Sequence, residues 1–245
     1  MDTPRVASRE EWLAARKELL AREKEATRVK DAVDQQRRAL PMIEIGKNYV
    51  FAGPGGTAGL PGLFGGRRQL IVYHFMWRHE ESGCPGEDQG CPTCSFLVDN
   101  IGHLSHLHAC DTSLVLVSRA PLASIERHRQ RMGWTVPWYS SYGSDFNYDF
   151  HVSFDEDVAP LEYNYKDKAT LERDVPYIHS GADAHGMSVF LRDGDRVFHA
   201  YSAYGRGVDQ LLGTYNYLDL TPLGRQRHVT GFPYHDKYDA DHAGS

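Results

Sequence analysis

Two apolar runs on either side of a cysteine pair restrict the fold of this chain more than any other feature of its sequence. Residues 69–77 and 112–118 are almost continuously apolar, which is typical of strands buried on both faces of a parallel sheet. Helices are predicted over 95–108 and 122–132. The resulting order of strand, helix, strand and helix indicates parallel strands joined by crossover helices. We therefore expect an α/β protein with a central sheet flanked by helices.

The cysteine pair Cys91-Pro92-Thr93-Cys94 lies between the first of these strands and the first helix. Unpaired amides and the dipole at a helix N-terminus stabilise a thiolate, so Cys91 is expected to be the more acidic and more exposed thiol. Cys94, one turn into the helix, is placed to resolve a mixed disulfide on Cys91. A metal-bearing pair and an inert pair are the alternatives. A structural zinc site usually requires a second pair of ligands at similar spacing, and the sequence has none.

Residues 1–41 are predicted to form a helical extension ahead of the folded domain. Ser8 and Glu11 form a capping-box pattern at its start. The stretch up to about Leu40 contains neither glycine nor proline, and Pro41 ends it. Such a helix is expected to lie across the main body or against a partner subunit, which makes a homodimer through this helix one expected arrangement. Its narrow apolar stripe comprises Trp12, Leu13, Leu19, Leu20, Val29 and Val33.

The rest of the chain is divided into a folded domain over 42–225 and a tail over 226–245 that is expected to be disordered. Near the end of the domain, residues 187–191 and 196–202 flank the turn sequence Arg-Asp-Gly-Asp, which predicts a β-hairpin. A helix over 208–218 is expected to close the domain.

Composition excludes several classes of partner. The formal net charge is -6 and the basic residues are scattered among acidic ones, so no nucleic-acid partner is expected. No apolar run approaches the roughly 20 residues that cross a bilayer, and residues 1–5 lack the apolar core of a secretory signal. We therefore expect a cytoplasmic protein with no membrane partner, in which lasting disulfides are rare. Of the other two cysteines, Cys110 is interpreted as a small core residue and Cys84 as a loop residue, a third thiol or a third metal ligand.

Several local sequences between about residue 5 and 226 carry a resemblance to known proteins. They are Tyr-His-Phe-Met at 73–76, Gly-Cys-Pro-Thr-Cys-Ser-Phe at 90–96, Ser-Arg-Ala-Pro-Leu at 118–122, Met-Gly-Trp at 132–134, Ser-Ser-Tyr-Gly-Ser-Asp-Phe-Asn-Tyr-Asp-Phe-His at 140–151, Phe-His-Ala-Tyr-Ser-Ala-Tyr at 198–204 and Gly-Thr-Tyr-Asn-Tyr-Leu-Asp-Leu-Thr-Pro at 213–222. On these segments the chain resembles the thioredoxin superfamily and, more closely, a bacterial family of unknown function that is commonly labelled thioredoxin-like or dithiol-disulfide isomerase-like. The resemblance implies a thioredoxin-like domain over 42–225, in the peroxiredoxin-like variant of that fold.

The chain departs from thioredoxins proper just before the penultimate strand, where they carry a cis-proline that faces the dithiol. Here residues 184–187 read Ala-His-Gly-Met. Copper-delivering thioredoxin-like proteins of the cytochrome oxidase assembly type have a histidine just before this strand, and His185 resembles it. Two thiolates and an imidazole suit copper(I) or zinc, so Cys91, Cys94 and His185 are candidate metal ligands. The alternative is that His185 only makes local hydrogen bonds.

Two further positions are candidates for a functional role. Arg119 follows the second apolar strand, at the sheet edge where parallel α/β proteins bind ligands, and could pair a substrate carboxylate or stabilise a thiolate. His199, Tyr201 and Tyr204 near the final hairpin are candidates for lining a pocket, although an aromatic core position is the alternative for Tyr201.

Three functions are consistent with these features. The first is a thiol–disulfide oxidoreductase that uses Cys91 and Cys94, with Arg119 as a further catalytic candidate, on a protein or small-molecule thiol and without a cofactor. The second is a copper-binding protein or copper-dependent oxidase with Cys91, Cys94 and His185 as ligands to copper or zinc. The third is a non-enzymatic, redox-sensing interaction module.

Overall fold

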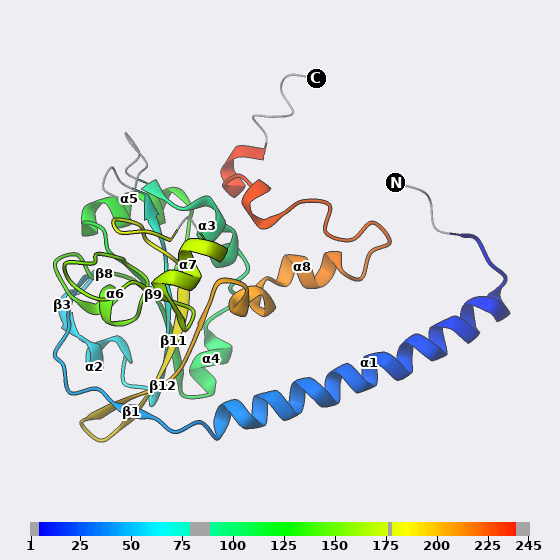
Figure 1. Ribbon diagram of the computed structural model, residues 1–245, viewed down its shortest axis with the longest axis horizontal. Helices are drawn as coiled ribbons and strands as arrows, with labels where there is room; N and C mark the ends of the chain where they lie inside the picture. Colours follow the sequence, from blue (N-terminus) through cyan, green and yellow to red (C-terminus); the bar gives the residue numbers. More distant parts are fainter. Residues whose placement is uncertain (1–4, 79–88, 176–177, 239–245) are drawn as a thin grey trace.

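The computed structural model describes residues 5–78, 89–175 and 178–238. Its centre is a twisted eight-stranded sheet with the order β1-β12-β11-β4-β7-β8-β2-β3 (Figure 1). The strands of this sheet are β1 (Ile43–Glu44), β2 (Val50–Gly53), β3 (Gly56–Gly59), β4 (Gln69–His74), β7 (Thr112–Ser118), β8 (Trp138–Ser140), β11 (Gly186–Asp193) and β12 (Arg196–Tyr204). Two small ribbons lie outside it: β5 (Trp77–Arg78) pairs with β6 (Gln89–Gly90), and β9 (Glu162–Tyr163) pairs with β10 (Lys166–Asp167).

Strand β4 occupies the middle of the sheet, as its apolar sequence predicts. It runs parallel to β7, with Tyr73 opposite Leu116, and antiparallel to β11, with His74 opposite Gly186. Strand β8 is parallel to β7 on the far side, and β11 and β12 form the predicted hairpin. The strand–helix–strand–helix unit followed by a hairpin is the thioredoxin-like arrangement that the family resemblance implies, so the expected fold class is confirmed.

Helices cover both faces of the sheet and enclose two cores. Successive side chains of a strand point to opposite faces, so Val72 and Tyr73 enter different cores. The helices of the body are α2 (Leu60–Leu63), α3 (Pro92–Asp99), α4 (Ser105–Ala109), α5 (Leu122–Arg131), α6 (Phe146–Asp149), α7 (Lys168–Asp174) and α8 (Gly213–Leu218). Tyr73 packs on the face covered by α3, α5 and α8, whereas Val72 packs on the face covered by α2 and α6. A third apolar cluster, which includes the fully buried Leu171, lies in the segment between α6 and β11 and reaches Tyr204 on β12.

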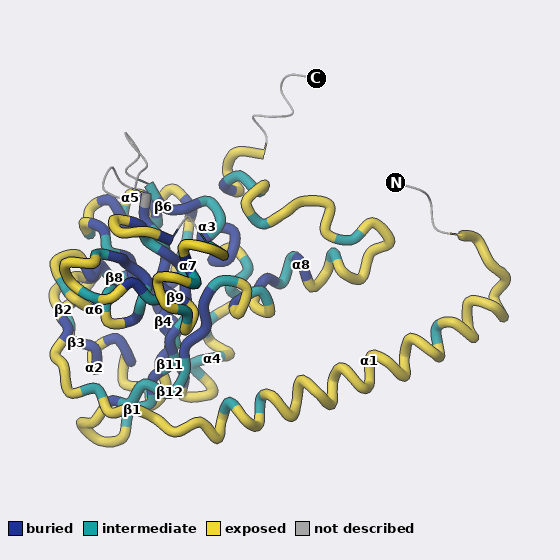
Figure 2. Tube along the Cα trace, in the orientation of Figure 1, coloured by how far each residue is buried: buried dark blue, intermediate teal, exposed yellow. Residues whose placement is uncertain are grey.

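The long N-terminal helix is α1 (Arg9–Arg38), which begins with the predicted capping box between Ser8 and Glu11. It projects away from the body as a single arm, exposed along almost its whole length (Figure 1 and Figure 2). At its C-terminal end it touches the body, where the Arg37 guanidinium lies 5.0 Å from the centre of the Tyr201 ring.

The prediction of a single helix over 95–108 is wrong, because α3 ends at Asp99 and α4 begins at Ser105. The side chain of Asn100 accounts for the break. Its amide donates to the carbonyl of Phe96 at 2.7 Å, which ends the helix. Its carbonyl oxygen accepts from the backbone N–H of Thr214 at 2.6 Å and from the hydroxyl at 2.8 Å, which ties this helix end to α8. The break therefore results from a tertiary contact.

The prediction of a disordered tail from residue 226 is wrong for residues 226–238, because they pack against the body. Phe232 stacks on Phe96 of α3 with ring centres 4.3 Å apart and planes 7° from parallel. The hydroxyl of Tyr234 donates to the carbonyl of Gly90, and Arg131 of α5 forms an ion pair with Asp236 at 2.7 Å. The aromatic side chains of this segment thus find partners on α3 and beside it.

The Phe96–Phe232 stack generates a stability prediction. We expect Phe232→Ala to lower the free energy of unfolding by about 2 kcal/mol, since the stack and part of the ring's burial are lost. Leu223→Ala is the matched control, because Leu223 lies in the same C-terminal region with half of its surface exposed. The control should change stability by less than about 0.5 kcal/mol. Urea denaturation of both variants measures the difference, and equal effects would contradict the docking of this segment.

Candidate functional site

The dithiol lies at the N-terminus of α3, directly beyond the end of β4. Cys91 is the N-cap residue, with extended backbone (φ -62°, ψ 130°), and Pro92 occupies the first turn, where a missing N–H costs nothing. The Cys91 N–H donates to the Met76 carbonyl at 3.2 Å, which joins the site to the segment after β4. The Cys91 carbonyl accepts from both the backbone N–H and the hydroxyl of Ser95, each at 2.9 Å. The backbone of Cys91 is therefore held from both sides.

The two thiols differ in burial and in hydrogen bonding, although both lie inside the protein. Cys91 is 4% exposed and Cys94 is 0% exposed, so the predicted difference in exposure is small. Burial raises the pKa of the Cys94 thiol well above its usual value, and its hydrogen bond to the Cys91 sulfur raises it further. The sulfur of Cys94 also accepts a hydrogen bond from the Tyr73 hydroxyl.

Tyr73 stays protonated in this position. Burial in the core raises the pKa of its phenol well above its usual value, and the neighbouring Cys94 raises it further. The Tyr73 hydroxyl is therefore a permanent donor to Cys94 and favours negative charge on that sulfur when it develops. Tyr73 was not identified as a site residue from the sequence, where it is one of nine residues in the almost continuously apolar run 69–77.

A second residue missed by the sequence analysis is His128 on α5. Its Nε2 atom lies 3.4 Å from the Ser95 hydroxyl, which in turn donates to the Cys91 carbonyl. A Cβ atom at Gly90 would lie only 2.8 Å from the same nitrogen, so only glycine fits beside this ring. The His128 ring is enclosed by the rings of Phe75, Trp77, Trp134, Trp138 and Tyr234.

This aromatic enclosure makes His128 a neutral residue near pH 7. Burial, together with the nearby Arg131 charge, lowers the pKa of its imidazole to about 4. A neutral imidazole can donate from one nitrogen and accept at the other, so it supports Ser95 without placing a positive charge behind the dithiol. The sequence gives only a weak signal for His128, namely its spacing of three residues from Ile125 and four from Ser124. This spacing places all three on one face of α5, and that face is buried.

The remaining candidates lie as follows. Arg119 immediately follows β7, as predicted, and its guanidinium lies 5.1 Å from the centre of the Tyr148 ring; its catalytic role stays a prediction. Cys110 is exposed at the end of α4, so the expected core position is wrong; it belongs to the turn into β7, where its carbonyl accepts from Thr112. Cys84 lies outside the described residues.

His185 lies immediately before β11, as expected, and makes local hydrogen bonds. Its Nε2 atom is 3.3 Å from the Gly205 carbonyl, and its own carbonyl accepts from the Tyr163 hydroxyl at 2.9 Å. Burial lowers the pKa of its imidazole. Within the described ranges, no three or more histidine, cysteine, aspartate or glutamate side chains are grouped so that they could hold a metal ion. Cys91, Cys94 and His185 therefore do not fit a copper or zinc site, and the copper alternative gains no support.

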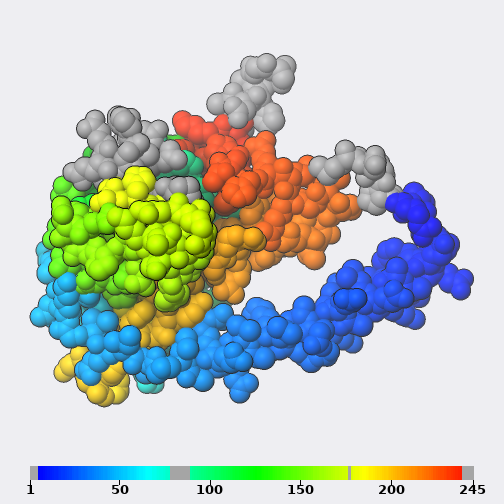
Figure 3. Space-filling view, viewed as in Figure 1, coloured from blue at the N-terminus to red at the C-terminus, as the bar shows by residue number. Residues whose placement is uncertain are grey.

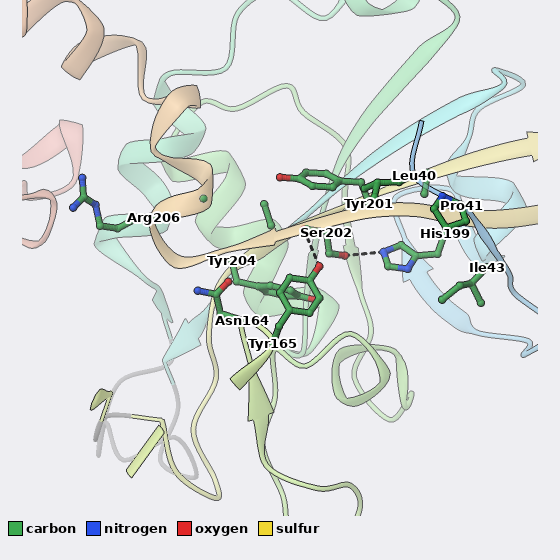
Figure 4. Close-up of a pocket in the computed structure, with 13 residues that line it drawn as sticks. Leu40, Pro41, Ile43, Asn164, Tyr165, His199, Tyr201, Ser202, Tyr204 and Arg206 are labelled. Carbon is green, nitrogen blue, oxygen red and sulfur yellow. Dashed lines mark hydrogen bonds between the residues drawn. The ribbon is translucent and has the colours of Figure 1, made fainter. Parts of the chain in front are cut away.

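An open pocket of about 710 Å³ lies along the edge of β12 (Figure 4). His199, Tyr201 and Tyr204 line it, as predicted, together with Leu40 and Tyr165. The Tyr165 hydroxyl donates to the Ser202 carbonyl at 3.0 Å. The pocket begins where β1 stops covering β12, since β1 pairs only with the first half of that strand.

A chain of hydrogen-bonded polar side chains leads from this pocket, where His199 is half-buried, to buried residues inside the sheet. The Nε2 atom of His199, the hydroxyl of Ser202, the hydroxyl of Ser188 and the Nε2 atom of His74 are joined by successive hydrogen bonds of 2.8 Å. Burial lowers the pKa of His74 to about 3, with a smaller effect from His199. Burial also lowers the pKa of His199. Both imidazoles are therefore neutral near pH 7, and each can act as donor or acceptor in the chain.

The lowered pKa of His128 predicts a pH dependence of stability. In the unfolded chain His128 titrates near 6.5, whereas in the fold it titrates near 4. The stabilisation that comes from the neutral His128 ring is fully present above pH 6.5 and is lost as the pH falls toward 4, because only the unfolded state binds the proton in that window. We expect this residue to lower the free energy of unfolding by about 3 kcal/mol between pH 7 and pH 4. Urea denaturation of wild type and His128→Gln at pH 7 and pH 4 isolates it, since other groups cancel. An equal loss in both proteins would contradict the assignment.

Comparison with solved structures finds chains of similar outline at low identity. Peroxiredoxin Q of Xanthomonas campestris, in one mutant structure, is 12% identical with a TM-score of 0.41, over 69% of this chain and 90% of that chain. A mutant of Xylella fastidiosa PrxQ is 9% identical with a TM-score of 0.43, over 72% and 94%. The Xanthomonas campestris bacterioferritin comigratory protein is 11% identical with a TM-score of 0.41, over 69% and 90%.

No curated protein matches the chain. None of the described helices combines the length and the apolar character needed to cross a membrane. One protein family does match: the sequence profile described as "Bacterial protein of unknown function (DUF899)" aligns with residues 1–238. The description names no activity, so it gives no support to the dithiol-disulfide isomerase label. Because the match covers nearly the whole chain, this protein belongs to the DUF899 family.

Proposed function

We propose that this protein is a thiol–disulfide oxidoreductase that uses Cys91 as nucleophile and Cys94 as resolving thiol. The observation that carries the proposal is the hydrogen-bonded series Tyr73, Cys94 and Cys91 at the start of α3. The thiol of Cys94 donates to Cys91, and the Tyr73 hydroxyl donates to Cys94. Each sulfur therefore has a donor that favours its anionic form at the step in which that sulfur attacks.

The reaction consists of two thiol–disulfide exchanges. The Cys91 thiolate attacks one sulfur of a substrate disulfide, which forms a mixed disulfide and releases the other sulfur as a thiolate that takes up a proton. Cys94 then loses its proton and attacks the Cys91 sulfur, which releases the second substrate thiol and leaves the Cys91–Cys94 disulfide. The substrate gains two electrons and the dithiol loses two. A small thiol such as glutathione, in the expected cytoplasmic setting, returns the enzyme to the dithiol by the reverse exchanges.

The buried environment of Cys94 makes the second exchange the slower one. Its thiol has a raised pKa, so little Cys94 thiolate exists near pH 7. In the mixed disulfide Cys91 no longer accepts the Cys94 proton, which removes one of the causes that raise the Cys94 pKa. Tyr73 continues to donate. Formation of the mixed disulfide thus lowers the barrier to its own resolution.

Single cysteine variants test the assignment of roles. Incubated with an aromatic disulfide, wild type should release two aromatic thiols and lose two hydrogens on the peptide that holds Cys91 and Cys94. Cys94→Ser should release one thiol and keep a stable adduct on Cys91, because the resolving thiol is gone. Mass spectrometry in a Cys110→Ser background measures the products, since Cys110 is exposed.

Cys91→Ser is the matched variant. It should form no adduct at Cys94, whose sulfur is 0% exposed and mostly protonated. A rapid adduct on Cys94 would reverse the assigned roles. Formation of the Cys91–Cys94 disulfide without repeated reduction of substrate in the presence of glutathione would instead favour the redox-sensing interpretation.

Removal of the Tyr73 hydroxyl should slow resolution selectively. In Tyr73→Phe the developing Cys94 thiolate loses its hydrogen-bond donor. We therefore expect the mixed disulfide on Cys91 to decay about tenfold more slowly. A tenfold change corresponds to about 1.4 kcal/mol, which is the size of one hydrogen bond to a charged group. The rate at which Cys91 is first modified should change by less than twofold. Stopped-flow release of the two aromatic thiols separates the steps. Equal slowing of both would assign Tyr73 a general structural role.

A further inference from the structure

The arm formed by α1 leaves its apolar residues exposed to solvent, since no described part of the chain covers them. None of its 30 residues is buried, and Trp12, Leu19 and Val33 are 60%, 53% and 45% exposed. The space-filling view shows the arm standing clear of the body over most of its length (Figure 3). Helices in proteins owe most of their stability to the packing of an apolar face, so an arm of this length indicates a partner.

The spacing of the apolar residues specifies the kind of partner. Trp12, Leu19, Ala26 and Val33 follow one another at intervals of seven, and Ala15, Arg22 and Val29 fall three residues after the first three of them. Six of these seven positions are apolar, and the stem of Arg22 is aliphatic. A repeat of 3.5 residues places all seven on one seam of a left-handed coiled coil.

The charges beside this seam favour a second copy in parallel orientation. One flank carries Glu11, Glu18 and Glu25, and the other carries Arg16, Glu23 and Lys30. In a parallel pair, each residue of the first flank meets the residue five positions later in the partner. That pairing joins Glu11 to Arg16 and Glu25 to Lys30, with only Glu18 and Glu23 in repulsion. In an antiparallel pair the glutamate flanks would face each other.

We propose that α1 forms a parallel two-stranded coiled coil with α1 of a second copy of this chain, so that the protein is a dimer held by its N-terminal arms. The ion pairs now within the helix, such as Arg16 with Glu23 at 2.8 Å, are exposed and contribute little. They can exchange for pairs between chains at small cost. The bodies, which begin immediately after α1, then lie at the same end of the coiled coil.

The oligomeric state of the full chain tests the proposal. Sedimentation equilibrium at up to about 0.1 mM protein should give twice the chain mass of 27.7 kDa. Leu19→Glu, on the seam, should give the mass of one chain. Leu20→Glu is the matched control, because Leu20 is similarly exposed but lies off the seam, and it should remain a dimer. A monomeric wild type, or equal effects of the two substitutions, would overturn the proposal.

The orientation is tested by cross-linking and charge exchange. Trp12→Cys should form a disulfide with its own copy under mild oxidation, mapped by mass spectrometry, since seam residues of a parallel pair face their equivalents. In an antiparallel pair, residues 12 would lie about 30 Å apart. A dimer without this cross-link would overturn the parallel arrangement. Glu25→Lys should weaken the dimer, and adding Lys30→Glu should restore it; failure to restore it would count against the proposed pairing.

Discussion

The packing of Cys94 against Tyr73 joins the helix that carries the dithiol to the centre of the sheet, and the proposed site depends on it. Tyr73 lies on the central strand and Cys94 lies in the first turn of α3, so the contact attaches that helix to the middle of the sheet. A cysteine at this position is small enough to be fully buried, and its sulfur accepts a hydrogen bond from the Tyr73 hydroxyl. That hydroxyl is itself buried and therefore needs a hydrogen-bond partner. The chemistry of Cys94 and the anchoring of α3 are therefore two consequences of one contact.

The support behind this contact comes from segments far apart in the chain. His128 of α5 holds Ser95, Ser95 holds the carbonyl of Cys91, and Tyr234 of the C-terminal segment holds the carbonyl of Gly90. The three links converge on residues 90–95, which include the dithiol. In the exchange that we propose, Cys91 changes its covalent state twice in each cycle, and the hydrogen bonds to its carbonyl hold its backbone in place without touching the sulfur.

The extent to which this arrangement follows from the sequence depends on the range of the contacts that determine it. The runs 69–77 and 112–118 and the dithiol between them are local patterns, and they correctly predict the central strands and the position of Cys91. The end of α3 is set by Asn100 binding Thr214, a contact across more than a hundred residues that no local pattern reports. The same holds for His128 and for Phe232, whose partners become visible only in the fold.

Each face of β4 carries one polar side chain with its own set of hydrogen-bond partners. Tyr73 points to the dithiol face, whereas His74 points to the other face, where it joins Ser188, Ser202 and His199 in a chain that ends at the pocket beside β12. Burial keeps the two imidazoles of this chain neutral, so the chain adds polarity to the sheet without adding charge. Within the central strand, adjacent residues thus face the thiol of Cys94, to which we assign a role in catalysis, and a neutral hydrogen-bonded network. The backbone of the strand lies between these two environments, because Tyr73 packs in the core that holds the dithiol and His74 packs against Phe146 in the core on the other face.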